Sequence, residues 1–241
     1  FDIVRELPDE EVYLKKEENN WITLKCGKSK FRLPGLAPED FPPLPEYSEK
    51  PLLEFDSKIL KEMIRKTFFS VSPDETRQAL NGLLLEMDGD SANLVGTDGH
   101  RLAMISRPVK SNASKGEALS FLLPKKALSE LLKLMEDEDA TLGFSSQDNH
   151  LAFICGKQVI VSRKIDGKFP NYRQVIPGDN QLKAKAGRND LTHALKRVAL
   201  LADEKSKMVR FEIGKGILTL ISDNTDLGAA VEEMPIEYDG E

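Results

Sequence analysis

The stretch ITLKCGKSKFRLPGLAPEDFP, residues 22–42, has a counterpart later in the chain, LAFICGKQVIVSRKIDGKFP, residues 151–170. Each copy has an alternating strand, a Cys-Gly-Lys turn, a second strand and a loop that closes on Phe-Pro. An amphipathic segment with an acidic turn precedes both copies, at residues 1–11 and 125–139. The sequence therefore predicts a repeated unit in which a helix precedes strands and a hairpin.

A second unit also occurs twice, and it too begins with a helix. Its first copy has apolar residues at helical spacing, before predicted strands at 83–89 and 92–98: Ile59, Leu60, Met63, Ile64 and Phe68. Its second copy precedes predicted strands at 208–216, 217–223 and 227–234, and its apolar residues are Leu191, Leu195, Val198 and Leu201. The predicted helices span residues 55–71 and 186–203.

The two kinds of unit alternate, and Pro-rich linkers at residues 41–51 and 173–181 separate them. This order predicts one complete domain at 49–178, between half domains at 1–48 and 179–241. Helices that cover the apolar face of antiparallel strands give an α+β fold. A chain that starts on one unit and stops on the other is predicted to be part of a longer protein.

Composition excludes several classes of protein. No apolar run reaches the length of a membrane span, and the N-terminus lacks the order of a signal peptide, so we expect a soluble, cytoplasmic protein. Cys26 and Cys155 lie far apart and without metal-ligand spacing, which predicts no disulfide framework, metal site or cofactor. The net charge of -6 excludes a protein that is basic throughout but leaves room for a local basic face.

The CGKS sequence at residues 26–29 shares Gly-Lys-Ser with phosphate-binding loops. The glycine that opens such a loop would stand at position 22, where Ile22 is found. The second copy, CGKQ, lacks the hydroxyl that would hold magnesium. Both copies are therefore predicted to be hairpin turns.

Residues 96–108, GTDGHRLAMISRP, place an acid, a histidine and an arginine beside one glycine. Asp98 and His100 are candidates for acid-base chemistry, with Arg101 as an anion clamp. The alternative is a turn in which Asp98 accepts backbone amides and Gly99 adopts a conformation that other residues resist. No Gly-x-Ser-x-Gly elbow or nearby nucleophile supports catalysis, so the turn is the favoured interpretation.

Three predicted helices present basic side chains opposite their apolar stripes. If equivalent helices lie side by side, these side chains form one surface suited to a phosphate backbone. The candidates for DNA contact on these helices are Lys58, Arg65, Lys125, Lys126, Lys133, Lys196 and Arg197.

Two motifs, TDGHRLA at 97–103 and FPNYRQVIP at 169–177, and the order of the units resemble the bacterial sliding clamps, the beta subunits of DNA polymerase III. The resemblance covers essentially the whole chain. It implies repeated clamp domains with inner helices and outer antiparallel sheets, and subunits that join head to tail as a homodimer around duplex DNA. It further implies a non-catalytic processivity factor of the polymerase holoenzyme, located in the cytoplasm with the nucleoid.

The same resemblance implies a hydrophobic groove for short linear peptides of polymerases, the clamp loader, and repair and lesion-bypass proteins. In such families the far side of the groove comes from the end of the third domain. Gln174 stands where the family often has arginine. The positions that match the groove are Leu80, Thr97, Gly99, His100, Arg101, Leu102, Pro170, Gln174 and Val175.

Arg77 matches a family position near duplex DNA, and it joins the candidates for DNA contact. The aromatic pair that follows this position in some members is Gln78 and Ala79 here. Two other functions stay open from the residues themselves. One is a small hydrolase or transferase that uses Asp98 and His100, and the other is a structural repeat protein with no role on DNA.

Overall fold

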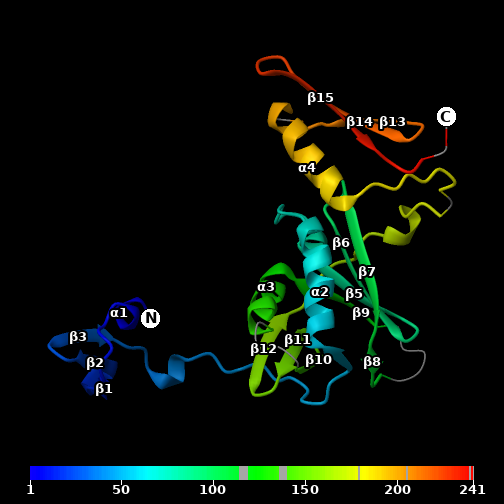
Figure 1. Ribbon diagram of the computed structural model, residues 1–241. Helices are drawn as coiled ribbons and strands as arrows, with labels where there is room; N and C mark the ends of the chain where they lie inside the picture. Colours follow the sequence, from blue (N-terminus) through cyan, green and yellow to red (C-terminus); the bar gives the residue numbers. More distant parts are fainter. Residues whose placement is uncertain (114–118, 136–139, 179, 205, 239, 241) are drawn as a thin grey trace. The chain divides into compact units, whose positions relative to one another are not determined.

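The computed structural model describes residues 1–113, 119–135, 140–178, 180–204, 206–238 and 240 (Figure 1). The chain forms two compact units, Phe1–Pro170 and Asn171–Glu241. The helices are α1 Asp2–Arg5, α2 Ser57–Thr67, α3 Lys125–Leu134 and α4 Arg188–Val198. The strands are β1 Val12–Lys16, β2 Trp21–Cys26, β3 Ser29–Pro34, β4 Leu53–Asp56, β5 Gly82–Asp88, β6 Ser91–Thr97, β7 Leu102–Pro108, β8 Lys110–Ser111, β9 Ser120–Pro124, β10 Thr141–Gln147, β11 His150–Cys155, β12 Gln158–Arg163, β13 Arg210–Gly214, β14 Ile217–Asn224 and β15 Gly228–Pro235.

The two Cys-Gly-Lys sequences form equivalent antiparallel hairpins. Cys26 pairs with Ser29 between β2 and β3, and Cys155 pairs with Gln158 between β11 and β12. The intervening glycines, at positions 27 and 156, have φ of 51° and 58°, in the left-handed region that favours glycine. The predicted hairpin turns are confirmed.

The helix α2 begins after Asp56, whose Oδ1 accepts hydrogen bonds from the backbone amides of Lys58 at 2.8 Å and Ile59 at 3.2 Å. An aspartate in this position satisfies amides that have no partner within the helix. The apolar side chains that follow at helical spacing face the core, and those that are fully buried are Leu60, Met63 and Ile64.

Two antiparallel sheets share the main core. Their strand orders are β12-β11-β10-β4-β8 and β7-β6-β5-β9. The ring of Phe121 on β9 meets that of Phe144 on β10 at a centroid distance of 5.1 Å, and Phe144 meets Phe153 on β11 at 5.3 Å. Edge-on and tilted aromatic contacts of this kind stabilise beyond the area they bury, and they join the two sheets through one core.

Two helices cover these sheets. α2 packs against β4, β6 and β7, α3 packs against β9 and β12, and the helices also contact each other (Figure 1). The ammonium of Lys61 donates a hydrogen bond to the carbonyl of Met135 at 3.1 Å, which ties α2 to the end of α3. The predicted α+β class, with helices on antiparallel sheets, is confirmed.

The unit Asn171–Glu241 repeats this pattern on a smaller scale. Its sheet has the order β13-β14-β15, and α4 packs on β14 and β15. The helix buries Ala194 and Val198 against Leu218, Leu220 and Met234. Near the N-terminus of the chain, β1, β2 and β3 form a second small antiparallel sheet.

The helices are shorter than the sequence predicts. The first, expected within the amphipathic segment at residues 1–11, spans Asp2–Arg5 and buries no side chain. The helices expected at 55–71 and 186–203 end at Thr67 and Val198, because each chain segment continues as a short 3₁₀ helix. Residues 136–139 of the predicted acidic turn lie outside the described residues.

Candidate functional site

The TDGHRL sequence forms the tight connection between β6 and β7. Thr97 and Leu102 are the last pair of the β6–β7 ladder, so only the residues between them turn. Gly99 has φ of 90°, a backbone conformation in which a residue with a side chain would be strained. The Oγ1 atom of Thr97 accepts the amide of Gly99 at 3.1 Å and donates to the carbonyl of Arg101 at 2.7 Å. The side chain of Thr97 therefore holds the turn at two points along its backbone.

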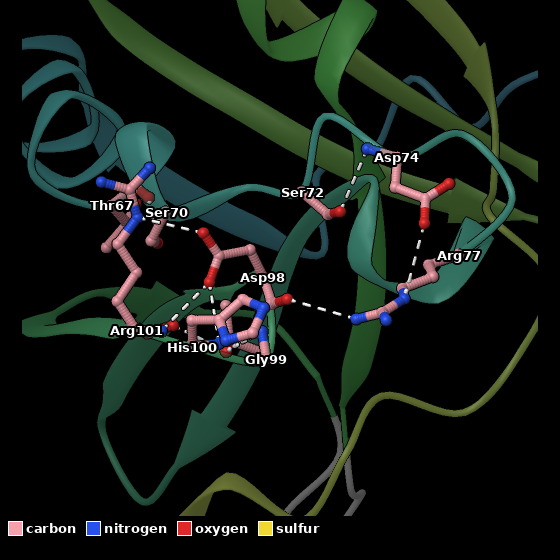
Figure 2. A network of polar contacts seen from close by, with 10 residues as sticks. Thr67, Ser70, Ser72, Asp74, Arg77, Asp98, Gly99, His100 and Arg101 are labelled. Carbon is pink, nitrogen blue, oxygen red and sulfur yellow. Dashed lines mark hydrogen bonds and ion pairs between the residues drawn. The ribbon is translucent and has the colours of Figure 1, made fainter. Parts of the chain in front are cut away.

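Asp98 is the centre of this turn (Figure 2). Its Oδ1 accepts the backbone amides of His100 and Arg101, each at 3.0 Å, and its Oδ2 accepts Nε of Arg101 at 3.1 Å. The two amides and then the Arg101 guanidinium hold the pKa of Asp98 at about 2. The carboxylate is thus ionised and committed to the backbone of its own turn.

Two further side chains fix the same turn. Arg77 donates from Nη1 to the carbonyl of Asp98 at 3.5 Å and lies 3.5 Å from the carboxylate of Asp74, so it joins the preceding loop to the turn (Figure 2). The guanidinium of Arg101 lies 5.5 Å from the ring centroid of Phe69, within the range of a cation–π contact. Phe69 is 56% exposed. Arg101 is thereby positioned at the surface rather than buried.

Gly96 brings the end of α2 directly onto β6. A Cβ atom at this position would lie 2.5 Å from Oγ of Ser70 and 2.9 Å from the carbonyl of Thr67. Ser70 itself donates a hydrogen bond to the carbonyl of Thr67 at 2.6 Å, so its side chain has no room to move away from Gly96. The close approach of the helix fixes the strand just before Thr97.

Gly96 and Phe69 were not predicted as site residues. Gly96 stands in the quoted GTDGHRL sequence, but a glycine at the end of a strand gives no indication of which helix approaches it. Phe69 follows Phe68 in what the sequence predicts as a buried helix end, and its exposure depends on where the 3₁₀ helix Phe68–Ser70 turns.

This geometry does not assemble an acid-base site. Both oxygens of Asp98 accept hydrogen bonds from its own turn, and a carboxyl group with a pKa of about 2 is a weak base. Within the part of the chain that the structure describes, the His100 imidazole has no hydrogen-bond partner, and no three His, Cys, Asp or Glu side chains group as metal ligands. The predicted turn role of Asp98 and Gly99 is confirmed.

The remaining groove candidates lie in both units. Leu80, half-buried, belongs to the 3₁₀ helix Gln78–Leu80, and its amide bonds the carbonyl of Arg77 at 2.8 Å. Pro170 is exposed at the end of the first unit. Gln174 and Val175 belong to the second unit, on and just after the 3₁₀ helix Tyr172–Gln174, and both are exposed. The structure thus places the Thr97–Leu102 turn and Arg77 together.

The basic candidates differ in how free their charges are. Lys126 is exposed at the start of α3 and, among the described residues, has no acidic partner. Lys133, at the other end of α3, lies 3.0 Å from the carboxylate of Glu130. On α4, Arg197 is paired with Glu232, which raises the pKa of Arg197 and lowers that of Glu232. Lys58, Arg65 and Lys196 are exposed on their helices.

Sequence models of one protein family match the chain in three consecutive regions. The model of the DNA polymerase III beta subunit, N-terminal domain, matches residues 1–45. The models of the central and C-terminal domains of the same subunit match residues 54–171 and 173–241. The chain belongs to the DNA polymerase III beta subunit family.

Curated members of the beta subunit family align along the whole chain. It is 36% identical over 248 residues to the beta sliding clamp of Caulobacter vibrioides and 31% identical over 243 residues to that of Escherichia coli K12. The alignments take in 66% and 65% of those two proteins, so the chain spans about two thirds of their length.

Solved structures of beta subunit family members have the same fold. The DNA polymerase III subunit beta of Pseudomonas aeruginosa matches with a TM-score of 0.90 and 31% identity, over 100% of this chain and 65% of that one. The sliding clamp of Bartonella birtlesii, bound to griselimycin, matches with a TM-score of 0.90 and 32% identity over the same shares. Within the described residues, no helix combines the length and apolar character needed to cross a membrane.

Proposed function

We propose that this protein acts as a DNA sliding clamp, a ring that encircles duplex DNA and tethers the replicative polymerase to it. The observation that carries the proposal is the match of three consecutive beta-subunit domains, together with relatives named beta sliding clamp. A ring that holds DNA by topology needs no base recognition and no catalysis of its own. It increases the effective concentration of polymerase at the primer end.

Three consecutive clamp domains at residues 1–48, 49–178 and 179–241 agree with this function. The second is complete, and the first and third contribute the sheet β1-β2-β3 and the sheet β13-β14-β15 with α4. Two subunits would join head to tail as a homodimer. The place of action is the cytoplasm, on the nucleoid.

The inner surface would be formed by the basic faces of α2, α3 and α4. Long-range attraction between exposed cations and phosphates retains DNA without fixing the protein to one sequence. Because the whole chain has a net charge of -6, the excess of acidic side chains then lies outside this surface. The side chains assigned to this surface are Lys58, Arg65, Arg77, Lys125, Lys126, Lys133, Lys196 and Arg197.

Partner proteins would dock short linear peptides into a groove beside the Thr97–Leu102 turn. The turn is held by Asp98 and Thr97, so it offers Leu102 and Arg101 to a ligand with little loss of conformational freedom. Apolar groups of Leu80, Leu102, Pro170 and Val175 would receive a partner's leucine or phenylalanine, and His100, Arg101 and Gln174 would bond its peptide groups.

The alternative of a hydrolase or transferase has no support in the geometry, because the carboxylate of Asp98 is engaged by two backbone amides and Arg101. A loading experiment tests the clamp function. The full-length subunit, loaded onto nicked circular DNA, should stay bound through gel filtration and be released when a nuclease linearises the circle. Equal retention on circular and linear DNA would exclude a topological mechanism.

A further inference from the structure

An open cleft of about 500 Å³ lies within the first unit, beside the start of α3. Three segments that are distant in sequence form it: the loop before β5, the first turn of α3, and the end of β12 with the residues that follow. Its ionisable lining residues are Glu75, Lys125, Lys126, Arg163, Lys164 and Asp166.

A backbone hydrogen bond and close packing hold these three segments together. The amide of Lys125 donates to the carbonyl of Asn81 at 3.2 Å, which joins α3 to the preceding loop. A Cβ atom at Gly82 would lie 2.7 Å from Cδ1 of Ile165, so the chain after β12 is pressed onto β5. A Cβ atom at Gly167, where φ is 128°, would lie 3.4 Å from Cβ of Ala79, in ordinary van der Waals contact. The cleft is therefore preformed.

The charges of the cleft are not balanced from within. Lys164 is engaged, since its Nζ donates to the carbonyl of Asp148 at 2.6 Å and lies over the ring of Phe121. Among the described residues, the side chains of Lys125, Lys126 and Arg163 have no acidic partner. Three free cations thus converge from α3 and β12, which contact each other (Figure 1).

The carboxylates of Glu75 and Asp166 also line the cleft, so its four cations exceed its two anions. Because the two carboxylates offset two of the four cations, the net positive charge of the cleft is small. Such a charge suits a single phosphate group better than a small molecule with several negative charges. A planar guanidinium and two flexible ammonium groups are the donors that phosphate oxygens accept.

We propose that this cleft seats a backbone phosphate of duplex DNA and that Arg163 is a DNA-contacting residue. The inference rests on the proposed clamp function, because Lys125 and Lys126 belong both to the cleft and to the proposed DNA surface. It extends that surface from the helices to the end of an outer strand. Because only one phosphate is held, the contact adds retention without stopping the protein from moving along DNA.

The salt dependence of DNA binding tests whether Arg163 contacts a DNA phosphate in this cleft. A labelled DNA duplex is titrated with the protein by fluorescence anisotropy over a series of salt concentrations, for the parent, Arg163→Gln and Lys157→Gln. Lys157 is exposed in the turn at the other end of β12, about 20 Å away along the strand, and its replacement removes the same charge.

Arg163→Gln should weaken binding about two- to fivefold at low salt. It should also reduce the slope of log affinity against log salt by about 1, for any duplex sequence. Lys157→Gln should leave the slope unchanged, and Arg163→Lys should restore it. Equal slopes for the parent and Arg163→Gln, or equal losses of affinity in Arg163→Gln and Lys157→Gln, would refute a phosphate contact of Arg163 in this cleft. The proposed clamp function would be unaffected by either result. A parent that binds no duplex at low salt would count against both.

Discussion

The carboxylate of Asp98 and the guanidinium of Arg101 lie 3.1 Å apart, and the same carboxylate accepts the backbone amide of Arg101. One acid therefore fixes both the backbone and the side chain of the arginine. An interaction of this kind stabilises the fold only while the acid is ionised. The turn that presents Arg101 thus depends on a single charge that is 15% exposed.

The loss of stability on replacing that charge should depend on pH in a defined way. Because the pKa of Asp98 falls from its ordinary 3.8 to about 2, its stabilising effect is complete above about pH 5 and is lost as pH falls through 2. Asp98→Asn should lower the free energy of unfolding by about 1–2 kcal/mol at neutral pH. The difference from the parent should stay constant down to about pH 5 and vanish below about pH 2.

Urea denaturation at a series of pH values, followed by circular dichroism, measures this difference. Asp90→Asn, in the exposed turn between β5 and β6, is the control for loss of one surface carboxylate. A gap between Asp98→Asn and the parent that does not narrow in acid would show that the charge is not what stabilises the turn.

The close approach of α2 to β6 predicts a large effect of one methyl group. Gly96→Ala places a Cβ atom 2.5 Å from Oγ of Ser70 and 2.7 Å from Cδ2 of Leu83, and it should destabilise by about 2–3 kcal/mol. Gly89→Ala is the matched control, since its φ of 61° costs about 1 kcal/mol but no atom lies within 4 Å. Urea midpoints compare the two. Similar losses of stability in the two variants would mean that the residues around Gly96 move aside without cost.

Leu102 should be necessary for peptide binding. An aspartate there puts a charge where a partner's apolar side chain would lie, so Leu102→Asp should weaken binding of a peptide that carries leucine and phenylalanine by more than about tenfold. Ser106→Asp, at an exposed position farther along the same strand, serves as the control. Fluorescence anisotropy of a labelled peptide measures both affinities, with thermal melts to verify the fold. Unchanged binding by Leu102→Asp would refute the groove.

Two of the three lysines of α3, Lys126 and Lys133, should contribute unequally to DNA binding. Lys126 has no acidic partner among the described residues, whereas Glu130 already neutralises Lys133 at 3.0 Å. Lys126→Gln should therefore reduce the salt slope of duplex binding by about 1, and Lys133→Gln by clearly less. The same anisotropy titration measures both. A larger effect at Lys133 would contradict an inner surface formed by the exposed start of α3.

Local patterns in the sequence predicted the parts of the fold that depend on neighbouring residues. The two Cys-Gly-Lys turns need a glycine with positive φ, and the glycine is visible in the sequence. The helix α2 has a clear apolar period and an aspartate cap. The strand β7 was missed, because GTDGHRLAMISRP was interpreted as a turn and only Ile105 of this strand is buried. The strand β1, exposed at every position, gives no alternation to detect.

The candidate site, like the fold, could be predicted only where it depends on neighbouring residues. That Asp98 shapes a turn followed from its place before a glycine. Gly96, Phe69 and Arg163 were not found, because their roles depend on contacts with α2, Arg101 and α3 that the fold brings together from distant positions. Residue type alone does not indicate which elements will meet.

The paired register of the two Cys-Gly-Lys hairpins also has a consequence for the order of folding. Each hairpin closes only the two residues between Cys26 and Ser29, or between Cys155 and Gln158, so its loop entropy is small. The ladder between β4 and β10 instead joins Leu53 to Phe144, across most of the central domain. Hairpins form in microseconds, whereas ladders that close long loops are slow. We therefore expect the two turns to form early in folding and the β4–β10 pairing of the five-stranded sheet to form late.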